Sequence, residues 1–557
     1  MLLILLACIY ITIICFAWGV FVYRLLGGDS KNTEYIPHLS ILCLLGFAAI
    51  SAIAGILSLF MPLGGWQAQL IVLLPSVIFL LRTHRKIIIE KIRIELILLR
   101  PPALILFFVC LVMLLVMSSW KIVHPDTLGY QAQSIQWIEK YKVIPGIVHL
   151  HTRFGYQGLW FTSCALFSLK FLGSNATTFL NTTILLWYTL FIVFKINKSI
   201  LQKENYLKEI FWILLLAISF WSYTQVRLTA TSASPDFIAN LFIWAIIYLL
   251  TDKKVSGKIK WLLISLLSLT AITIKLSALP VIIFFIIAAI LFLKEKEIRL
   301  FMLLVVMAVI TLLPFVARNV ISSGYIVFPT TAVDIVNADW KYNTQLTNLE
   351  NDYIKAYART ETDRSKEAIE SSVNMKLSKW LPAWWANRSL ADKTILIVFA
   401  LTFFTSLLWF KKIISTDLNI KIALMIMLVG IIFWFINAPD PRFGFGFLIG
   451  FIAIVSNFLI PATRLKKLVL LFSLAAAVIA ISVYSAYRFN HFFKGDQWLQ
   501  PLGIEKINYK TIKCGEIKIN QPPANFPFGN IPVPCTDDSC EHFILRGLKI
   551  TDGFRAK

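Results

Sequence analysis

The sequence predicts an all-α polytopic membrane protein, and three observations carry this prediction. Of the 557 residues, 58% are hydrophobic and 15% are charged, which is too apolar for an ordinary soluble protein. Apolar runs of about 17–25 residues recur along the chain, and each is long enough to span a bilayer. Basic residues gather in short loops between these runs, which is typical of cytoplasmic loops. This distribution explains most of the net charge of +23, so no nucleic-acid partner is inferred.

The apolar runs predict about fourteen transmembrane helices with both termini extracytoplasmic, because the basic loops then all lie inside. The first run lacks a basic leader and a clear cleavage site, so it is interpreted as a span rather than a signal peptide. The stretch 159–172 is short and contains polar residues, which favours an interfacial or half-inserted helix over a fifteenth span. The predicted spans are 2–26, 37–61, 66–82, 101–120, 176–195, 209–226, 236–251, 260–276, 278–293, 299–317, 394–410, 420–437, 443–461 and 467–487.

These spans divide the chain into six regions. An N-terminal four-span region (1–120) precedes a first large extracytoplasmic loop with juxtamembrane helices (121–175), and a central transmembrane region follows (176–317). A second extracytoplasmic loop (318–393), a C-terminal transmembrane region (394–487) and a small extracytoplasmic tail (488–557) complete the chain.

Both outer segments of the C-terminal half carry local signals. In the second loop, residues 343–378 have the pattern of a polar helix, and Trp384 and Trp385 are placed as an interfacial anchor. The tail has Pro and Gly punctuation and is expected to be a soluble segment too small to be more than an appendage. Its stretch 520–535, NQPPANFPFGNIPVPC, is expected to be loop. Cys514 and Cys535 are one candidate disulfide pair that would leave Cys540 over, but the spacing does not determine the connectivity.

The most informative residue is Asp126, in the motif HPDTLGY only a few residues after a predicted span. A carboxylate so close to the hydrocarbon is costly unless it lines a wet cavity or a binding site. It could act as general base toward an acceptor hydroxyl or amine, or as a metal ligand. The alternative is a structural role, in which the carboxylate satisfies backbone N–H groups at a helix start.

Other ionisable residues fall at the outer ends of predicted spans. Asp236 follows Pro235 at the start of a span, which is also an ordinary capping arrangement. His149 and His151 could form a metal pair, although solvated interfacial histidines are the favoured interpretation. Together the acids and cations predict a site for a lipid-linked phosphate, with cations neutralising the phosphate. The cations are Arg153 in the first loop and Lys275, Arg318 and Arg442 at span ends.

These residues resemble a known family. The segments PDTLGYQAQSIQWIEKYKVIPGI and HTRFGYQGLWF resemble the first outer loop of the GT-C fold glycosyltransferases, such as protein O-mannosyltransferases and lipid A aminoarabinose transferases. The later motifs SPDFIANLF, KLS, ARNVISSGYIVFP and PDPRFGF resemble motifs of that family in the same order, over about residues 100–460. The chain as a whole also resembles bacterial polytopic membrane proteins, from which no acceptor can be carried over.

The resemblance implies an inverting glycosyltransferase in the bacterial inner membrane. It would move a sugar from a polyprenyl-phosphate-linked donor to a glycan, lipid or protein acceptor at the extracytoplasmic face, among membrane lipids. The implied catalytic residues are Asp126 as base and Asp236, which would orient the acceptor or a partner cation. No cofactor is certain, and a divalent metal stays open. The implied substrate-binding residues are His124, Tyr130, His151, Arg153, Lys275, Arg318, Asn319 and Arg442.

Two other functions share some of these features. A transporter or flippase for lipid-linked saccharides would be expected to place charges in the middle of its spans and to contain discontinuous helices. A ligase or polymerase of cell-envelope polysaccharide would use the same donors and a large outer loop. The ionisable residues cluster at one face instead, which disfavours a transporter. The position of the acidic loop early in the chain favours a transferase over a ligase.

Overall fold

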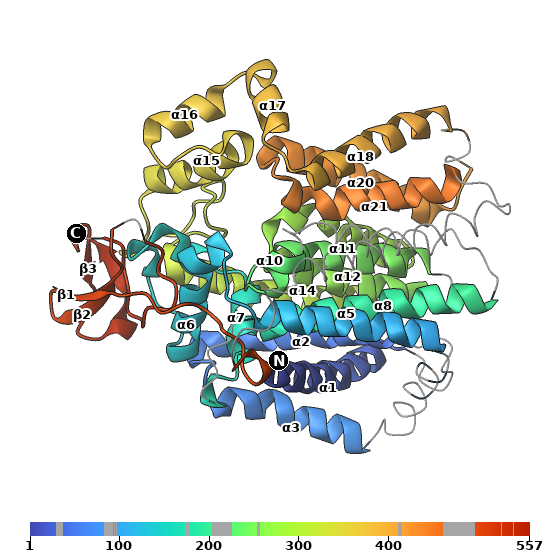
Figure 1. Ribbon diagram of the computed structural model, residues 1–557, viewed down its shortest axis with the longest axis horizontal. Coiled ribbons are helices and arrows are strands. Elements are labelled where there is room, and N and C mark those ends of the chain that lie inside the picture. Colours follow the sequence, from blue (N-terminus) through green and yellow to red (C-terminus); the bar gives the residue numbers. More distant parts are fainter. Residues whose placement is uncertain are drawn as a thin grey trace.

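The computed structural model describes the chain in segments. The described residues are 1–28, 37–82, 99–172, 178–202, 226–252, 257–409, 415–459, 496–524, 526–538 and 540–557, together with positions 93, 95, 97, 255 and 411. Helices dominate these residues, and strands occur near the C-terminus (Figure 1).

Seven helices in the described part are long and apolar enough to cross a membrane, so the chain is a mostly helical multi-pass membrane protein. They are α1 (Leu2–Leu25), α2 (Leu39–Phe60), α12 (Gly257–Ile274), η5 with α13 (Leu276–Val281 and Ile282–Lys294), α14 (Ile298–Ser323), α18 (Leu390–Leu408) and α20 (Leu418–Asn437). Five further apolar helices are α3 (Trp66–Arg82), α5 (Pro101–Ser119), α8 (Phe179–Gln202), α11 (Asp236–Thr251) and α21 (Pro441–Leu459).

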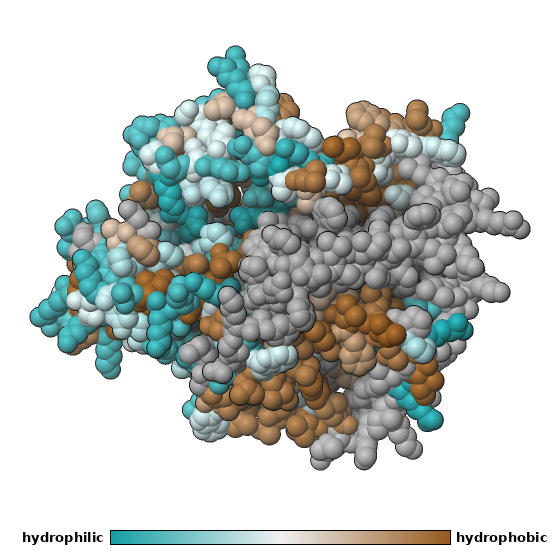
Figure 2. All heavy atoms as spheres, in the orientation of Figure 1, coloured by the Kyte–Doolittle hydropathy of each residue, from teal (hydrophilic) through white to brown (hydrophobic). Residues whose placement is uncertain are grey.

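Twelve of the fourteen predicted spans therefore coincide with apolar helices of the described part. The predicted spans 209–226 and 467–487 lie outside the described residues, except for residue 226. The total of fourteen stays a prediction. Figure 2 shows hydrophobic side chains gathered over the long helices and hydrophilic ones over the end of the bundle that carries α15, α16 and the strands.

Helices α1 and α2 pack very closely, and two glycines allow it. A Cβ atom on Gly19 would lie 1.8 Å from the carbonyl oxygen of Leu42, and one on Gly46 would lie 1.7 Å from that of Cys15. Any side chain at either position would overlap the backbone of the neighbouring helix. Small residues at such crossings let membrane helices approach each other closely. Close packing matters in lipid because no hydrophobic effect drives the helices together there.

Short elements cover one end of the helix bundle. After α5, the first loop forms η1 (Thr127–Gln131), α6 (Ala132–Lys140), η2 (Ile147–His149), η3 (Thr152–Gly155), α7 (Leu159–Leu166) and η4 (Lys170–Leu172). Helix α7 has eight residues, all of them buried, and η4 follows it with exposed apolar side chains. The interfacial or half-inserted position of the stretch 159–172 stays a prediction. Helix α10 (Val226–Ala230) precedes α11 at the same end.

The segment between α14 and α18, called the α15 loop (residues 324–389), contains three helices. The expected polar helix 343–378 is divided into α15 (Thr344–Thr360) and α16 (Lys366–Asn374), because Glu361 takes a left-handed conformation that ends α15. Helix α17 (Leu377–Ala386) follows. Of the two tryptophans predicted as an interfacial anchor, Trp384 is buried and donates a hydrogen bond to the carbonyl oxygen of Pro439, while Trp385 is exposed.

The tail is described from residue 496, and it contains strands as well as the expected loop, which occupies the described residues of 522–534. It contains η6 (Asp496–Trp498), two antiparallel hairpins, β1 (Lys510–Cys514) with β2 (Ile517–Gln521) and β3 (Phe543–Leu545) with β4 (Phe554–Ala556), and η7 (Ile550–Asp552). Its apolar residues share a core with the first loop, which contributes Trp137, Ile144, Ile147, Leu150 and Phe154.

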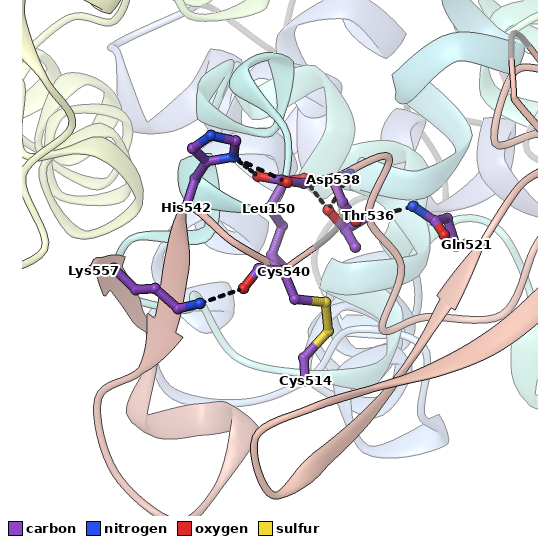
Figure 3. The surroundings of a disulfide bond; sticks show 8 residues. All are labelled: Leu150, Cys514, Gln521, Thr536, Asp538, Cys540, His542 and Lys557. Carbon is purple, nitrogen blue, oxygen red and sulfur yellow. Dashed lines mark hydrogen bonds and ion pairs between the residues drawn. A yellow bond between two sulfur atoms is a disulfide. The ribbon is translucent and has the colours of Figure 1, made fainter.

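One disulfide joins the tail's two halves. Cys514 is bonded to Cys540, next to the hydrogen bond from Thr536 to the carbonyl oxygen of Leu150 in the first loop (Figure 3). The candidate pair Cys514–Cys535 is therefore wrong. Cys535 is a buried thiol that donates to the side-chain oxygen of Gln133 at 3.0 Å.

The start of α1, the end of α5 and the tail meet at one end of the bundle. The backbone N–H of Leu3 donates to Leu499 at 3.1 Å, and that of Leu502 donates to Ser119 at 2.9 Å. The N-terminus and the described part of the tail thus lie at the same end of the bundle.

Candidate functional site

A cavity of about 600 Å³ lies at this end of the bundle, where several helix ends converge. Its walls come from the first loop, the start of α11, the junction of α12 with η5, the last turns of α14 and α20, the start of α21, and α15. The lining side chains used below are Asp126, Tyr130, Arg153, Tyr156, Asp236, Lys275, Asn319, Tyr353, Tyr357, Arg364, Arg442 and Phe443.

Asp126 reaches the cavity because the chain turns sharply after α5. Pro125 and Asp126 precede the short helical turn η1, and the ring nitrogen Nδ1 of His124 accepts a hydrogen bond from the N–H of Thr127 at 3.3 Å. His124 thus satisfies a backbone group at this turn, which leaves the Asp126 carboxylate available for other contacts. The Asp126 side chain is 26% exposed and faces two arginines.

Asp236 and Lys275 are brought together from separate helices. Asp236 is the first residue of α11, where the helix dipole favours a carboxylate, and its N–H donates to Ser234 Oγ at 3.3 Å. Lys275 has an extended backbone between α12 and η5, and its ammonium forms an ion pair with Asp236 Oδ1. The same ammonium lies 3.7 Å from the centre of the Phe443 ring.

Arg442 bridges the two carboxylates. Its Nη1 lies 3.4 Å from Asp126 Oδ2 and 3.4 Å from Asp236 Oδ2, while its Nε contacts Asp440 Oδ2 at 3.1 Å. Arg153 Nη1 contacts the other oxygen of Asp126, Oδ1, at 3.2 Å. Five side chains therefore form a continuous series of alternating charge, called here the charge chain: Arg153, Asp126, Arg442, Asp236 and Lys275.

The electrostatics of the first loop favour an ionised Asp126. Burial by itself would raise the pKa of Asp126, but the cations Arg442 and Arg153, together with His124, outweigh burial and lower it. Burial would likewise lower the pKa of Arg153, yet the pKa is raised because Tyr130, Asp126 and Glu350 lie close by. Asp126 is therefore a carboxylate at any pH near neutrality, and a weak base while both arginines contact it.

Glu350 is a functional candidate that the sequence interpretation did not include. It lies on α15, its side chain is 6% exposed, and it accepts a hydrogen bond from the Tyr156 hydroxyl at 2.6 Å. Its Oε1 also lies 3.6 Å from Arg153 Nε and 3.7 Å from Arg364 Nη2. The sequence does carry a signal for this residue. Glu350, Tyr353 and Tyr357 recur at helical spacing, which places them on one face of a polar helix.

The remaining predicted site residues are distributed differently. Tyr130 lines the cavity, with the Arg153 guanidinium 5.3 Å from its ring centre. Asn319 also lines it, and its amide is used locally, donating to the carbonyl oxygen of Phe315 at 2.8 Å and accepting from the N–H of Phe328 at 3.2 Å. His124 is buried beside the cavity rather than lining it.

Two predicted substrate contacts point elsewhere. His151 packs between Phe154 and Phe528, and its Nε2 lies 3.5 Å from Asp537 in the tail. Burial lowers the pKa of His151 to about 3, so the ring is neutral and this contact is not an ion pair. Arg318 is 2% exposed and turns away from the large cavity, where it donates to Ser58 Oγ and to the side-chain oxygen of Gln157. The phosphate-contact prediction for Arg318 does not fit this orientation.

The five side chains of the charge chain line the cavity and are paired with one another. Among the described residues, no three His, Cys, Asp or Glu side chains are grouped closely enough to hold a metal ion. The cavity combines four cations and two carboxylates with aromatic walls, so it can bind an anionic group with an apolar attachment and place a carboxylate beside it.

Comparison with known proteins reveals a family. A family model described as a domain of unknown function (DUF8201) matches residues 1–449. No curated protein and no solved structure matches the chain. The matched residues include every member of the charge chain and Glu350, whereas the tail lies beyond them.

Proposed function

We propose that this chain, which belongs to the DUF8201 family, is a glycosyltransferase of the GT-C type. It would transfer a sugar from a polyprenyl-phosphate-linked donor to an acceptor at the extracytoplasmic face of the bacterial inner membrane. The observation that carries the proposal is the bridge made by Arg442 between Asp126 and Asp236 in a cavity at the ends of membrane helices. Such a site offers cations for a phosphate and a carboxylate for a nucleophile in one place.

The reaction assigned to this site is a single displacement with inversion. An acceptor oxygen attacks the anomeric carbon of the donor sugar, and the bond from that carbon to the phosphate oxygen breaks. The electron pair leaves with the polyprenyl phosphate, whose negative charge Arg153, Arg442 and Lys275 stabilise. The proton of the acceptor hydroxyl passes to Asp126. Asp236 holds Lys275 and Arg442 in place.

The charges of the site support an anionic ligand that competes for the arginines. Four cations and two carboxylates line the cavity, and two further carboxylates, Glu350 and Asp440, contact those cations. The four positive and four negative charges therefore cancel before a ligand binds. A donor phosphate would take over contacts that Arg153 and Arg442 make with Asp126. The Asp126 oxygens then become available to the acceptor, and losing a cationic neighbour raises the carboxylate's basicity.

The apolar walls support a prenyl chain and a sugar. Phe315, Phe433, Trp434 and Phe443 line the cavity from membrane helices, and Tyr353 and Tyr357 line it from α15. Aromatic faces suit both hydrocarbon and sugar rings, because they offer large apolar surfaces with polar edges. The acceptor would enter from the side of α15.

The test is a transfer assay in proteoliposomes with a radiolabelled polyprenyl-phosphate sugar and an extract of cell-envelope acceptors. Asp126→Asn should reduce transfer by at least about 100-fold, since a positioned general base contributes about 10²–10⁴. Asp334→Asn is the matched control, because Asp334 pairs with Lys341 in the α15 loop and does not line the cavity. Near-normal transfer by Asp126→Asn would overturn the assignment.

The same vesicles separate the alternatives. A flippase would move the labelled lipid across the bilayer without forming product, and Asp126→Asn would change that movement. A ligase would consume an oligosaccharide donor but not a monosaccharide one. Either outcome would replace the transferase proposal.

A further inference from the structure

A second, much smaller cavity lies beside the large one, and four of the side chains in its walls carry a buried polar atom without a hydrogen-bond partner among the described residues. It is lined by residues of α6, of the following turn and of the last turns of α14, and it has about 10 Å³ of room for the centre of a water-sized sphere. This is about the room that one water molecule needs, so the cavity takes at most one small occupant. The lining residues that matter are Ser134, Trp137, Lys142, Arg318 and Ser322.

Four buried side-chain atoms of residues in this cavity's walls make no hydrogen bond to any residue that the structure describes. They are Arg318 Nε, Trp137 Nε1, Ser134 Oγ and Ser322 Oγ. An arginine Nε–H and an indole N–H can only donate, and a serine hydroxyl can donate as well. Buried polar groups are costly unless they are hydrogen-bonded, so these four side chains around one small space suit a bound acceptor.

The charge of Arg318 decides between an anion and a water molecule. Its two terminal nitrogens donate to Ser58 Oγ and Gln157 Oε1, which are both neutral, and no carboxylate of the described residues forms an ion pair with it. A buried cation without a counter-ion is strongly unfavourable. A water molecule would accept hydrogen bonds from some of the donors but would leave the positive charge of Arg318 uncompensated. A monatomic anion would accept the hydrogen bonds and also compensate the charge.

Lys142 is the one exposed residue among those that line the cavity. By contrast, Arg318, Trp137 and Ser322 are buried. The Lys142 ammonium adds a second positive charge, which would attract an anion from solution.

We propose that Arg318, Trp137, Ser134 and Ser322 form a binding site for a single halide ion, chloride under ordinary conditions. The ion stabilises Arg318 and, through the bond from Arg318 to Gln157, the segment that carries Arg153. Gln157 lines both cavities, so the halide site adjoins the large cavity without sharing its ligand. The proposal does not depend on the glycosyltransferase assignment.

The first measurement is the unfolding temperature of the purified full-length protein in detergent, followed by tryptophan fluorescence. Chloride or bromide replaces gluconate at constant ionic strength. The unfolding temperature should rise saturably with either halide. In the double variant Ser134→Ala/Ser322→Ala, the halide concentration for half the effect should rise about tenfold or more, because two donors to the anion are lost.

Two controls make the result decisive. Ser265→Ala removes another buried serine hydroxyl without a partner, on α12 and outside this cavity, and should leave the halide response unchanged. A bromide-grown crystal should show an anomalous peak within hydrogen-bond distance of Arg318 Nε. The absence of that peak, with an ordered water in its place, would overturn the proposal. So would a halide response that is equal in wild type and in the double variant.

Discussion

The α15 loop and the tail cover the same end of the helix bundle, but they contribute to it in different ways. The α15 loop places Tyr353, Tyr357 and Arg364 in the wall of the large cavity and Glu350 directly behind Arg153. Among the described tail residues, none lines that cavity. The two segments are joined by a bidentate ion pair in which Arg546 Nε and Nη2 contact Asp339 at 2.8 and 2.9 Å.

The tail acts instead on the first loop. It donates from the N–H of Phe554 to the carbonyl oxygen of Pro145 at 2.9 Å, and Gln133 of α6 donates to the carbonyl oxygen of Ile531 at 2.8 Å. The first loop carries Asp126 and Arg153. By packing on this loop the tail supports the site, although none of its described residues lines the cavity. The comparison predicts that changes in the α15 loop alter transfer, whereas changes in the tail alter stability.

Glu350→Gln should have the largest effect on transfer in this comparison. The amide keeps the shape but loses the charge that holds Arg153 and Arg364, so the proposed phosphate contact of Arg153 would be misplaced. We expect kcat/KM to fall by about 10- to 100-fold, the range that small displacements in a site produce. Glu370→Gln is the control, since Glu370 is an exposed residue of α16. Equal kinetics for the two variants would contradict a role of the α15 loop in the site.

Tyr156→Phe should have a smaller effect on transfer. It removes one hydrogen bond to Glu350 but leaves the carboxylate in contact with both arginines. Loss of about 1 kcal/mol corresponds to about a fivefold decrease in kcat/KM. In the double variant with Glu350→Gln, the Tyr156 change should add little, and fully additive effects would show that the two residues act separately.

The pH dependence of stability tests the packing of His151 against the tail. Burial against Phe528 of the tail lowers the pKa of His151 to about 3, below its ordinary value near 6.5. Between these values the unfolded chain binds a proton that the folded protein does not, so stability falls as the pH falls below about 6.5, by about 1.4 kcal/mol per pH unit. Denaturant unfolding at pH 7.5 and 5.5 should show this loss in wild type and a smaller one in His151→Gln. The exposed His542 provides the control His542→Gln, which should behave as wild type.

The disulfide should have the smallest effect on transfer. Replacing Cys514 and Cys540, 26 residues apart, with serine should destabilise the tail by about 3 kcal/mol on the chain-entropy model. Transfer at low temperature should change less than about threefold, because no tail residue described here lines the cavity. Limited proteolysis under non-reducing conditions measures the first effect, and peptide mapping should find Cys535 unlinked. A loss of transfer with an intact tail would show that the tail contributes more than support.

Local composition was sufficient to predict the membrane helices and the positions of several charges. A span is recognised by its length and apolarity, so twelve predicted spans coincide with helices of the described part. Asp126, Asp236, Lys275 and Arg442 each lie at the end of an apolar run, and such ends meet at one face of a helical bundle. Their convergence in one cavity follows from this topology, although their catalytic and binding roles remain predictions.

Only the tertiary structure decided which groups meet. Arg318 and Asn319 are neighbours in the sequence, but successive residues on a helix point about 100° apart, so they face different cavities. Glu350 joins Arg153 across 197 positions of sequence, and Cys540 rather than Cys535 reaches Cys514. Hydropathy and spacing act over a few residues along the chain, whereas pairing depends on packing between segments distant in sequence.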